Sequence, residues 1–232
     1  MGSLYEHQDV LNLAYKVFHK EGIDTVYHTG DMCDGEKMRR GHEYDIYVHG
    51  ADAQVKNCVE KYPRFKGIRT FFILGGHDIS FWVHSGVDIG EKIAEKRKDL
   101  ICLGRDEQDV ALSWRGRQAR VRLLHPWWGS AYALSYQIQK YIDSLSGGQK
   151  PNIVLCGHTH KAEYLPCYRN VFTLQTGCIQ GQTPFMRGKN LASHVGFWIV
   201  EFRIDPEGGV SRLKAEFFPV YEERFYTEVK VK

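Results

Sequence analysis

Two histidines that follow an apolar run are the residues most able to do chemistry. The run from Ile153 to Cys156 predicts a short buried strand, which ends at Gly157 and is followed by His158 and His160. Neutral imidazole is the commonest metal ligand among side chains, and two imidazoles on the turn after a strand could reach two neighbouring metal ions. A polar turn explains this pair equally well when the pair is taken alone.

Three other apolar runs end at residues that can bind a metal or transfer a proton. They are Val26–His28, followed by Gly30, Asp31, Asp34 and Gly35; Phe71–Leu74, followed by Gly75, Gly76, His77 and Asp78; and Val121–Leu124, followed by His125. In α/β sheets, ligands bind outside the carboxyl ends of the strands. We therefore expect the metal-binding side chains at these strand ends to converge in one pocket.

In this order, the patterns Gly-Asp-x-x-Asp-Gly, Gly-x-His-Asp, a lone His and Gly-His-x-His resemble those of the calcineurin-like metallophosphoesterase family. The resemblance covers nearly the whole chain, and the ordered set carries it rather than any single pattern. Residues His49–Gln54 and Gly129–Tyr136 are most similar to the small archaeal, bacterial and phage members akin to the double-strand-break repair nuclease. The resemblance implies an α/β fold in which two packed mixed β-sheets are flanked by helices, a four-layer α-β-β-α sandwich.

The resemblance also implies a site for two divalent metal ions. Such ions lie ~3.5–4 Å apart, clamp a phosphate and activate a water. Asp31 would bridge the two ions, His125 and His158 would bind one of them, and His160 would bind the other. Mixed imidazole and carboxylate ligation favours Mn²⁺, with Fe, Zn or Ni as alternatives, over Ca²⁺ and Mg²⁺.

Other polar residues are assigned to proton transfer and support. By resemblance, His77 would protonate the leaving oxygen or steady the phosphoryl group, and Asp78 would hold the His77 imidazole in the required tautomer. Asp34 would support the ligands or the turn rather than bind metal. His42 and His49 lie on a polar loop of the kind that shapes the rim of a site, and we expect neither to bind metal.

Two parts of the family's pattern are missing. The family begins with a strand ending in Asp-x-His, whereas this chain starts at Met1-Gly2-Ser3, where the turn after that strand would be. We expect residues 1–232 to form one metallophosphoesterase domain truncated at its N-terminus, as a fragment, through a misjudged start codon or as a cloning remnant. The absent strand would lie beside the strand that leads to Gly30, and the edge left open would promote association. In addition, Gly76 stands where the family has an Asn ligand.

Bulk properties fit a globular protein outside the membrane. The chain has 232 residues, 43% of them hydrophobic, and a net charge of +3 that neither requires nor excludes nucleic acid. No apolar run approaches the ~20 residues that span a membrane, and no secretory signal is visible at the start. Six cysteines show no Cys-x-x-Cys spacing, so we expect buried or loop thiols in a reducing cytoplasm rather than disulfides.

Periodicity and turn residues predict the elements that position the site. Helices are expected over residues 11–18, 52–62 (with Asp52 as the N-cap), 88–98 and 131–145. Strands are expected over residues 25–28, 68–74, 100–103, 110–114, 119–124, 152–156, 162–165, 171–174, 195–202 and 212–218. Arg115, Arg117, Arg120 and Arg122 are expected to form a solvated strand face, with contact to phosphates as the alternative.

Two functions of different classes follow. The first is metal-dependent hydrolysis of phosphodiesters, with DNA ends as a candidate substrate and nucleic acid therefore a candidate partner. The second is a catalytically silent protein that uses the same sandwich as a protein-binding scaffold. Gly76 and the missing ligands favour the scaffold, whereas the retained cluster of His and Asp residues favours the enzyme. The metal content of the purified protein discriminates between them.

Overall fold

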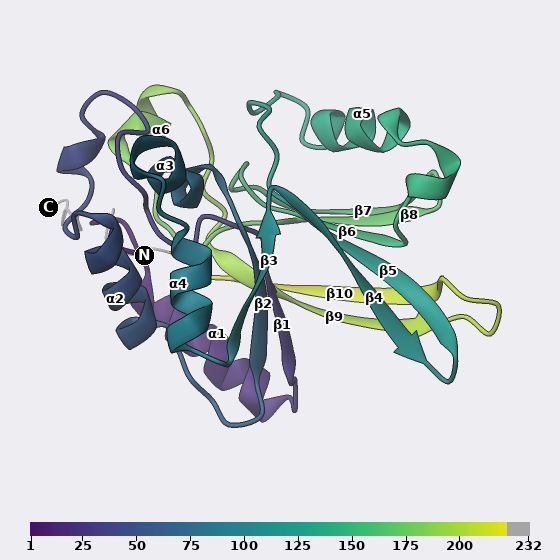
Figure 1. The fold of residues 1–232 in the computed structure, drawn as a ribbon. Helices are drawn as coiled ribbons and strands as arrows, with labels where there is room; N and C mark the ends of the chain where they lie inside the picture. The colour runs from purple at the N-terminus through teal and green to yellow at the C-terminus, as the bar shows by residue number, and fades with distance from the viewer. Residues whose placement is uncertain (222–232) are drawn as a thin grey trace, which may run out of the picture.

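The computed structural model describes residues 1–221, which form an α/β arrangement of several packed sheets flanked by helices (Figure 1). The helices are α1 (Gln8–Lys20), α2 (Ala51–Lys61), α3 (Gly76–Ser85), α4 (Ile89–Lys96), α5 (Tyr136–Ser144) and α6 (Pro184–Gly188), with 3₁₀ turns at His42–Tyr44 and Gly147–Gln149. The strands are β1 (Thr25–His28), β2 (Arg69–Leu74), β3 (Leu100–Arg105), β4 (Glu107–Trp114), β5 (Arg117–Leu124), β6 (Ile153–Cys156), β7 (Ala162–Tyr168), β8 (Val171–Thr176), β9 (Gly196–Ile204) and β10 (Val210–Pro219). Among these residues, no helix is long and apolar enough to cross a membrane.

The described strands form three sheets. The first has three parallel strands in the order β1-β2-β3, and the second has five strands in the order β4-β5-β6-β8-β7. In the five-stranded sheet β5, β6 and β8 are parallel, while β4 and β7 pair antiparallel at the two edges. Strands β9 and β10 pair with each other as an antiparallel ribbon. The α/β class is therefore confirmed, but one sheet is wholly parallel and the C-terminal strands form a separate ribbon.

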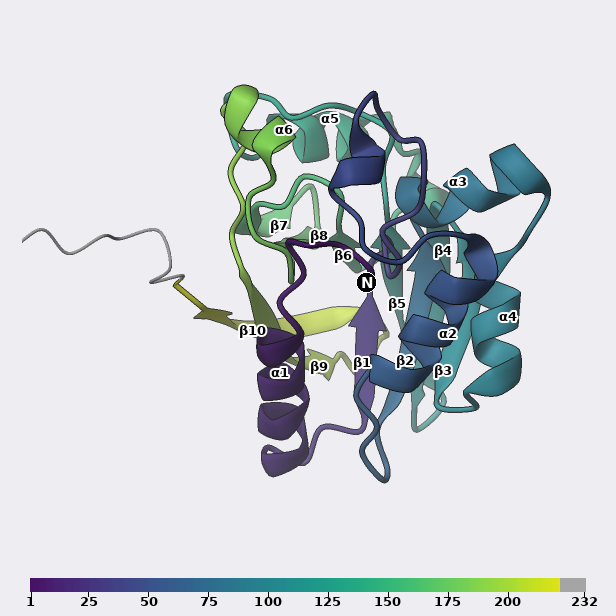
Figure 2. The same ribbon diagram turned by 90° about the vertical axis from the view of Figure 1, so that its left-hand side faces the viewer.

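Helices cover the outer faces, and apolar side chains fill the space between the layers. Figure 2 shows α2 and α4 beside the three-stranded sheet, with α1 near β9 and β10 on its other side. Six buried residues of β2, β5, β6 and β8 form the core between the two larger sheets: Ile73, Val121, Leu123, Ile153, Leu155 and Leu174. A second core between the five-stranded sheet and α5 includes Ile138, Ile142 and Val154.

Two expected helices need correction, and one helix was not expected. The helix expected over residues 52–62 begins at Ala51, after Gly50. Asp52 therefore lies in the first turn of this helix and is not its N-cap. The helix expected from residue 131 begins only at Tyr136, because the carbonyls of Ala131 and Leu134 accept hydrogen bonds from the side chains of Lys161 and Gln175 instead of from helical N–H groups. The chain after Gly75, for which no helix was expected, forms α3.

The arginine cluster is also only partly as expected. Arg115 and Arg117 are exposed at the β4–β5 turn. Arg122 is only 6% exposed, and its guanidinium forms a bidentate hydrogen bond with Asp109 at 2.6 and 3.0 Å. A fully paired, buried guanidinium is not available to a phosphate. For Arg122 the expectation of a solvated face is therefore wrong.

Candidate metal centre

Three strand ends bring potential metal ligands together. Asp31 follows β1, His125 follows β5 and His158 follows β6, and the ligand atoms of these three side chains all lie within 4.8 Å of one another. Parallel strands place their carboxyl ends at one edge of a sheet, so residues far apart in the chain meet there. This is the arrangement that the pattern of strand ends led us to expect.

The backbone at these strand ends is unusual. Asp31, His158 and His160 have positive φ angles of 57°, 73° and 56°. Non-glycine residues adopt this left-handed conformation in only a few per cent of cases, because Cβ then crowds the backbone. Such residues cluster at functional sites, where the surrounding structure holds them in place. The turns that present the ligands are therefore defined by tertiary contacts and not by local preference.

Glycines allow the strand ends to approach closely. A Cβ added to Gly75 would lie 2.4 Å from Asp31 Oδ1, and one added to Gly30 would lie 2.5 Å from His125 Nδ1. At Gly157 it would lie 2.5 Å from the carbonyl oxygen of Thr29. No real Cβ fits at these distances, so only glycine is compatible with the observed spacing at each position.

His125 connects the two larger sheets. Its imidazole is 2% exposed, Nδ1 lies 2.7 Å from the carbonyl oxygen of Thr29, and Nε2 lies 3.2 Å from Asp31 Oδ2. Burial would lower the pKa of His125, but the Asp31 carboxylate outweighs it and raises that pKa to about 9. Burial likewise opposes ionisation of Asp31, yet His125 and His77 hold its pKa well below the usual range. Without a metal, the pair is an imidazolium beside a carboxylate.

The residues present fit a divalent cation. Within residues 1–221, Nε2 of His125 and Nδ1 of His160 are buried with no hydrogen-bond partner. Burial and the neighbouring charge of His125 lower the pKa of His158 to about 4, so this imidazole is neutral at pH 7 and free to bind metal. A cation would replace the proton of His125 and would be held by Nε2 together with the adjacent Asp31 carboxylate.

His160 lies near this group of three but is not part of it. Its side chain is half-buried and close enough to Asp31 and His125 for both to act on its pKa. Burial lowers that pKa, and the adjacent Cys178 thiol raises it more, with a net rise. Burial opposes ionisation of Cys178, but His160 gives its thiol a pKa below the usual value. Cys178 carries no signal in the sequence that would have selected it.

The structure corrects the role expected for Asp78. Its carboxylate is 1% exposed and accepts hydrogen bonds from the backbone N–H groups of Met32 at 3.1 Å, Cys33 at 2.8 Å and Gly75 at 3.0 Å. It therefore fixes the turn after β1 against the start of α3. The imidazole of His77 is held by another group, the carbonyl oxygen of Asp34, which lies next to its Nδ1.

Asp34, His42 and His77 form a second cluster, in which the potential ligand atoms lie within 4.8 Å of one another. Nε2 of His42 lies 3.3 Å from Asp34 Oδ2, and the His42 ring packs against the His77 ring with centroids 5.4 Å apart. His42 is 1% exposed, so it lies inside the loop and not on its rim. His49 is exposed and 3.9 Å from Glu36. The Asp34–His42–His77 cluster was not foreseen, because nothing in the spacing connects His42 with Asp34.

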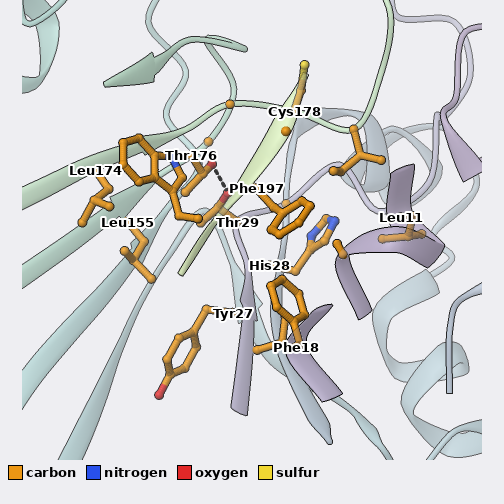
Figure 3. Close-up of a pocket in the computed structure, with 18 of the residues that line it drawn as sticks. Leu11, Phe18, Tyr27, His28, Thr29, Leu155, Leu174, Thr176, Cys178 and Phe197 are labelled. Carbon is orange, nitrogen blue, oxygen red and sulfur yellow. Dashed lines mark hydrogen bonds between the residues drawn. The ribbon is translucent and has the colours of Figure 1, made fainter. Parts of the chain in front are cut away.

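The centre opens into a cavity of about 990 Å³. Figure 3 shows Leu11, Phe18 and Phe197 on one side of it, and Leu155 and Leu174 on another. The hydroxyls of Thr29 and Thr176, which both line the cavity, are joined by a hydrogen bond of 2.9 Å. The polar centre therefore lies above a largely apolar interior space.

Comparison with solved structures finds a loose likeness in fold. A double mutant of Vps29 from Entamoeba histolytica is 14% identical, with 95% of this chain and 93% of that chain covered and a TM-score of 0.42. Vps29 from Chaetomium thermophilum is 10% identical (84% and 95% covered, TM-score 0.36), and TM1076 from Thermotoga maritima is 13% identical (84% and 98% covered, TM-score 0.36). No protein-family model and no curated protein sequence matches the chain. No functional inference rests on this likeness.

Proposed function

We propose that the chain is a metal-dependent phosphoesterase that hydrolyses phosphodiesters at the centre formed by Asp31, His125, His158 and His160. The convergence of Asp31, His125 and His158 within 4.8 Å, with the buried Nε2 of His125 facing the Asp31 carboxylate, carries the proposal. Manganese is the ion we favour for this group, because carboxylate and imidazole ligands suit it. DNA ends are one candidate substrate.

Each residue has a distinct task in this proposal. Bound divalent cations supply Lewis acidity toward a phosphoryl oxygen and lower the pKa of a bound water. Asp31 is oriented for binding by the backbone N–H of His77, which donates to Oδ1 at 2.8 Å. His125 is oriented by Thr29, and His158 is already neutral. The ligands thus need little rearrangement.

His77 is placed to handle the proton of the leaving group. A bond from its Nδ1–H to the carbonyl of Asp34 puts the remaining proton-transfer capacity on Nε2. The side chain is half-buried and lines the cavity beside Asp31, so one face is accessible to a substrate. General acid–base groups contribute roughly 10²–10⁴-fold to turnover.

The test combines metal binding with hydrolysis of bis(p-nitrophenyl) phosphate. Asp31→Asn is expected to abolish both Mn²⁺ binding and turnover, while Asp52→Asn, a change at an exposed carboxylate of α2, leaves both intact. His77→Ala is expected to cut turnover by roughly 10²-fold or more while metal content stays unchanged. His84→Ala, at an exposed position on the same helix, is the matched control. Loss of metal from His77→Ala would make His77 a ligand and overturn its assigned role.

The second candidate function is a protein-binding scaffold without catalysis. Two observations favour it: His160 lies outside the group of three ligands, and Gly76 offers no side chain. A scaffold is expected to contain no stoichiometric metal after purification in Mn²⁺ and to show no turnover. Metal bound stoichiometrically and lost in Asp31→Asn would contradict it.

A further inference from the structure

The thiol of Cys178 and the imidazole of His160 lie close enough for each to shift the pKa of the other, and their backbones are linked through His194. The two residues follow β8 and β6, which are neighbouring parallel strands of the five-stranded sheet. Cys178 also lines the cavity below the metal centre, where Figure 3 shows it close to Thr176. A sulfur ligand is therefore placed beside a nitrogen ligand at the same end of the sheet.

The backbone around this pair is fixed by hydrogen bonds. The N–H of Cys178 donates to the carbonyl of His194 at 3.1 Å, and its own carbonyl accepts from the N–H of Gly196 at 3.0 Å. The N–H of His194 in turn donates to the carbonyl of His160 at 2.8 Å. Both residues are thus tied to one segment, which keeps the sulfur and the imidazole together.

The polar groups around Sγ of Cys178 offer more lone pairs than there are protons for them to accept. Sγ of Cys178 lies 3.2 Å from the carbonyl oxygen of Gln180 and 3.1 Å from the hydroxyl oxygen of Ser193. That hydroxyl already directs its proton to the carbonyl of Gln180, at 2.5 Å. Among residues 1–221, Nδ1 of His160 is buried with no hydrogen-bond partner. A positive ion would satisfy this excess of lone pairs.

We propose that Cys178 binds a divalent cation together with His160, and that this position of the metal centre selects Zn²⁺ over Mn²⁺. The inference rests on the proposed function, since it concerns the second position of the same centre. Thiolate and imidazole ligands suit Zn²⁺, whereas carboxylate and water suit Mn²⁺. On coordination a sulfur–metal bond replaces the S–H bond of Cys178, and the proton leaves to the solvent.

The two positions of the centre then differ in chemical softness. Asp31, His125 and His158 offer a carboxylate and two imidazoles. Cys178 and His160 add a polarisable sulfur at the other position. Zn²⁺ supplied in a limiting amount beside excess Mn²⁺ is expected to occupy the second position first.

Cobalt reports directly on a sulfur ligand. Chelator-treated full-length protein is titrated with Co²⁺, and a sulfur-to-cobalt charge-transfer band in the near ultraviolet is followed. The band is expected to saturate in the wild type, to disappear in Cys178→Ser and to persist in Cys167→Ser, a change at the exposed cysteine. Zinc affinity is expected to fall at least about tenfold in Cys178→Ser, while Mn²⁺ affinity is unchanged.

Two outcomes overturn the inference in distinguishable ways. Cobalt binding without a charge-transfer band, or with a band that persists in Cys178→Ser, removes Cys178 from the centre and leaves the proposed function intact. No binding of Co²⁺ or Mn²⁺ by the wild type defeats both proposals. Cys178→His guards against misfolding of the serine variant, because it retains a ligand and is expected to bind Co²⁺ without the band.

Discussion

The strands β6 and β1 both end at the metal centre, yet they are supported very differently. β6 is hydrogen-bonded to β5 on one edge and β8 on the other, and all four of its residues are buried. β1 is hydrogen-bonded to β2 alone among the described strands, and all four of its residues are half-buried. One half of the centre thus rests on a fully paired strand, and the other half rests on a strand with an open edge.

The cavity runs along that open edge. Its lining includes consecutive residues of β1, from Thr25 to His28, and consecutive residues of β9, from Gly196 to Phe202. Side chains alternate between the two faces of a strand, so a cavity lined by consecutive residues follows an edge and not a face. A strand residue in packed sheets occupies roughly 160 Å³ (a 3.3 Å rise, a 4.8 Å strand spacing and a 10 Å layer spacing). The cavity of about 990 Å³ is therefore large enough to admit a short strand along the edge of β1.

Comparison of the two strands shows that a metal ligand can be well positioned even when the strand before it is paired on one edge only. Asp31 follows the open-edged β1, but its carboxylate is held by the backbone of His77 and faces His125. Both of these partners belong to other strand ends. The support of the centre comes from across the sheets, and the weakness of β1 is expected to appear in stability before it appears in geometry.

Filling the open edge is expected to have the largest effect. A strand of about six residues ending in Asp-x-His, joined ahead of Met1, should pair with β1 and occupy the cavity. Buried unpaired groups cost ~1–3 kcal/mol each, so pairing several of them should raise the melting temperature by about 5–10 °C for a chain of this size. Metal affinity should rise as well, and size-exclusion chromatography should show less self-association than for the 232-residue chain.

A matched strand separates packing from ligation in that experiment. The same extension with Ala in place of its Asp and His is expected to raise the melting temperature without tightening Mn²⁺ binding. If the 232-residue chain is monomeric and melts as high as either extended form, β1 does not require a neighbouring strand and is as well supported as β6.

Breaking the His125–Asp31 pair, which connects the two larger sheets, is expected to have the next largest effect on stability. The pKa of His125 is raised from 6.5 to about 9, so its contribution to stability is complete below about pH 6.5 and is lost as the pH rises through about 9. Asp31 has a lowered pKa, so its contribution is present above about pH 4 and is lost in stronger acid. The pair therefore stabilises the metal-free fold most between about pH 4 and 6.5.

His125→Asn tests this window. Urea unfolding in chelator at pH 6.5 should show a loss of about 3 kcal/mol at most, given the size of the shift, and the loss should shrink by pH 9.5. His84→Asn, at an exposed position, should change little at either pH. A loss independent of pH would mean that His125 acts by packing alone.

Identical substitutions in the two strands give a smaller and more direct contrast. Val154→Ala in β6 removes a side chain that is 0% exposed and packed under α5. It is expected to cost about 2–3 kcal/mol. Val26→Ala in β1 removes a half-buried side chain that already lines the cavity, and is expected to cost less than about 1 kcal/mol. Equal costs in denaturant unfolding would show that β1 is packed as well as β6.

The smallest expected effect concerns Gly76. An added Cβ there meets only the indole of Trp127 at 3.7 Å and the end of Met38 at 3.8 Å, so a side chain fits without strain. Gly76→Asn is expected to tighten Mn²⁺ binding about tenfold, which corresponds to ~1.4 kcal/mol. Gly76→Ala is the control for helix stabilisation. No gain in affinity beyond that of the Ala variant would mean that the start of α3 serves another purpose.

The sequence predicted the features that depend on strand ends. The apolar run before Gly30 gave β1 its observed bounds, and the placement of Asp31, His125 and His158 together follows from the carboxyl ends of strands in an α/β sheet. Helix α3 escaped prediction because Gly75 and Gly76 indicate a turn. What favours a helix start there is Asp78, whose carboxylate accepts from the N–H of the N-cap Gly75 at 3.0 Å and also from the distant turn at Met32.

Contacts between distant segments explain the other differences. Asp78 follows His77 in the sequence, and the family resemblance therefore suggested that Asp78 orients the His77 imidazole. In the structure its carboxylate instead accepts hydrogen bonds from three backbone N–H groups. His42 contacts Asp34 because the loop between them folds back, and the sequence of this loop has no periodicity that would predict its conformation. The contact of Cys178 with His160 likewise arises only when β8 is laid beside β6.

The three glycines that crowd the centre have a consequence for how the protein tolerates mutation. At Gly30, Gly75 and Gly157 an added methyl group would meet a neighbour at 2.4–2.5 Å. In a saturation mutagenesis screen, alanine at these positions is therefore expected to be as damaging as loss of a ligand, although no glycine touches a metal. Such a screen would then identify the centre by the positions that require glycine as clearly as by the positions that require a metal ligand.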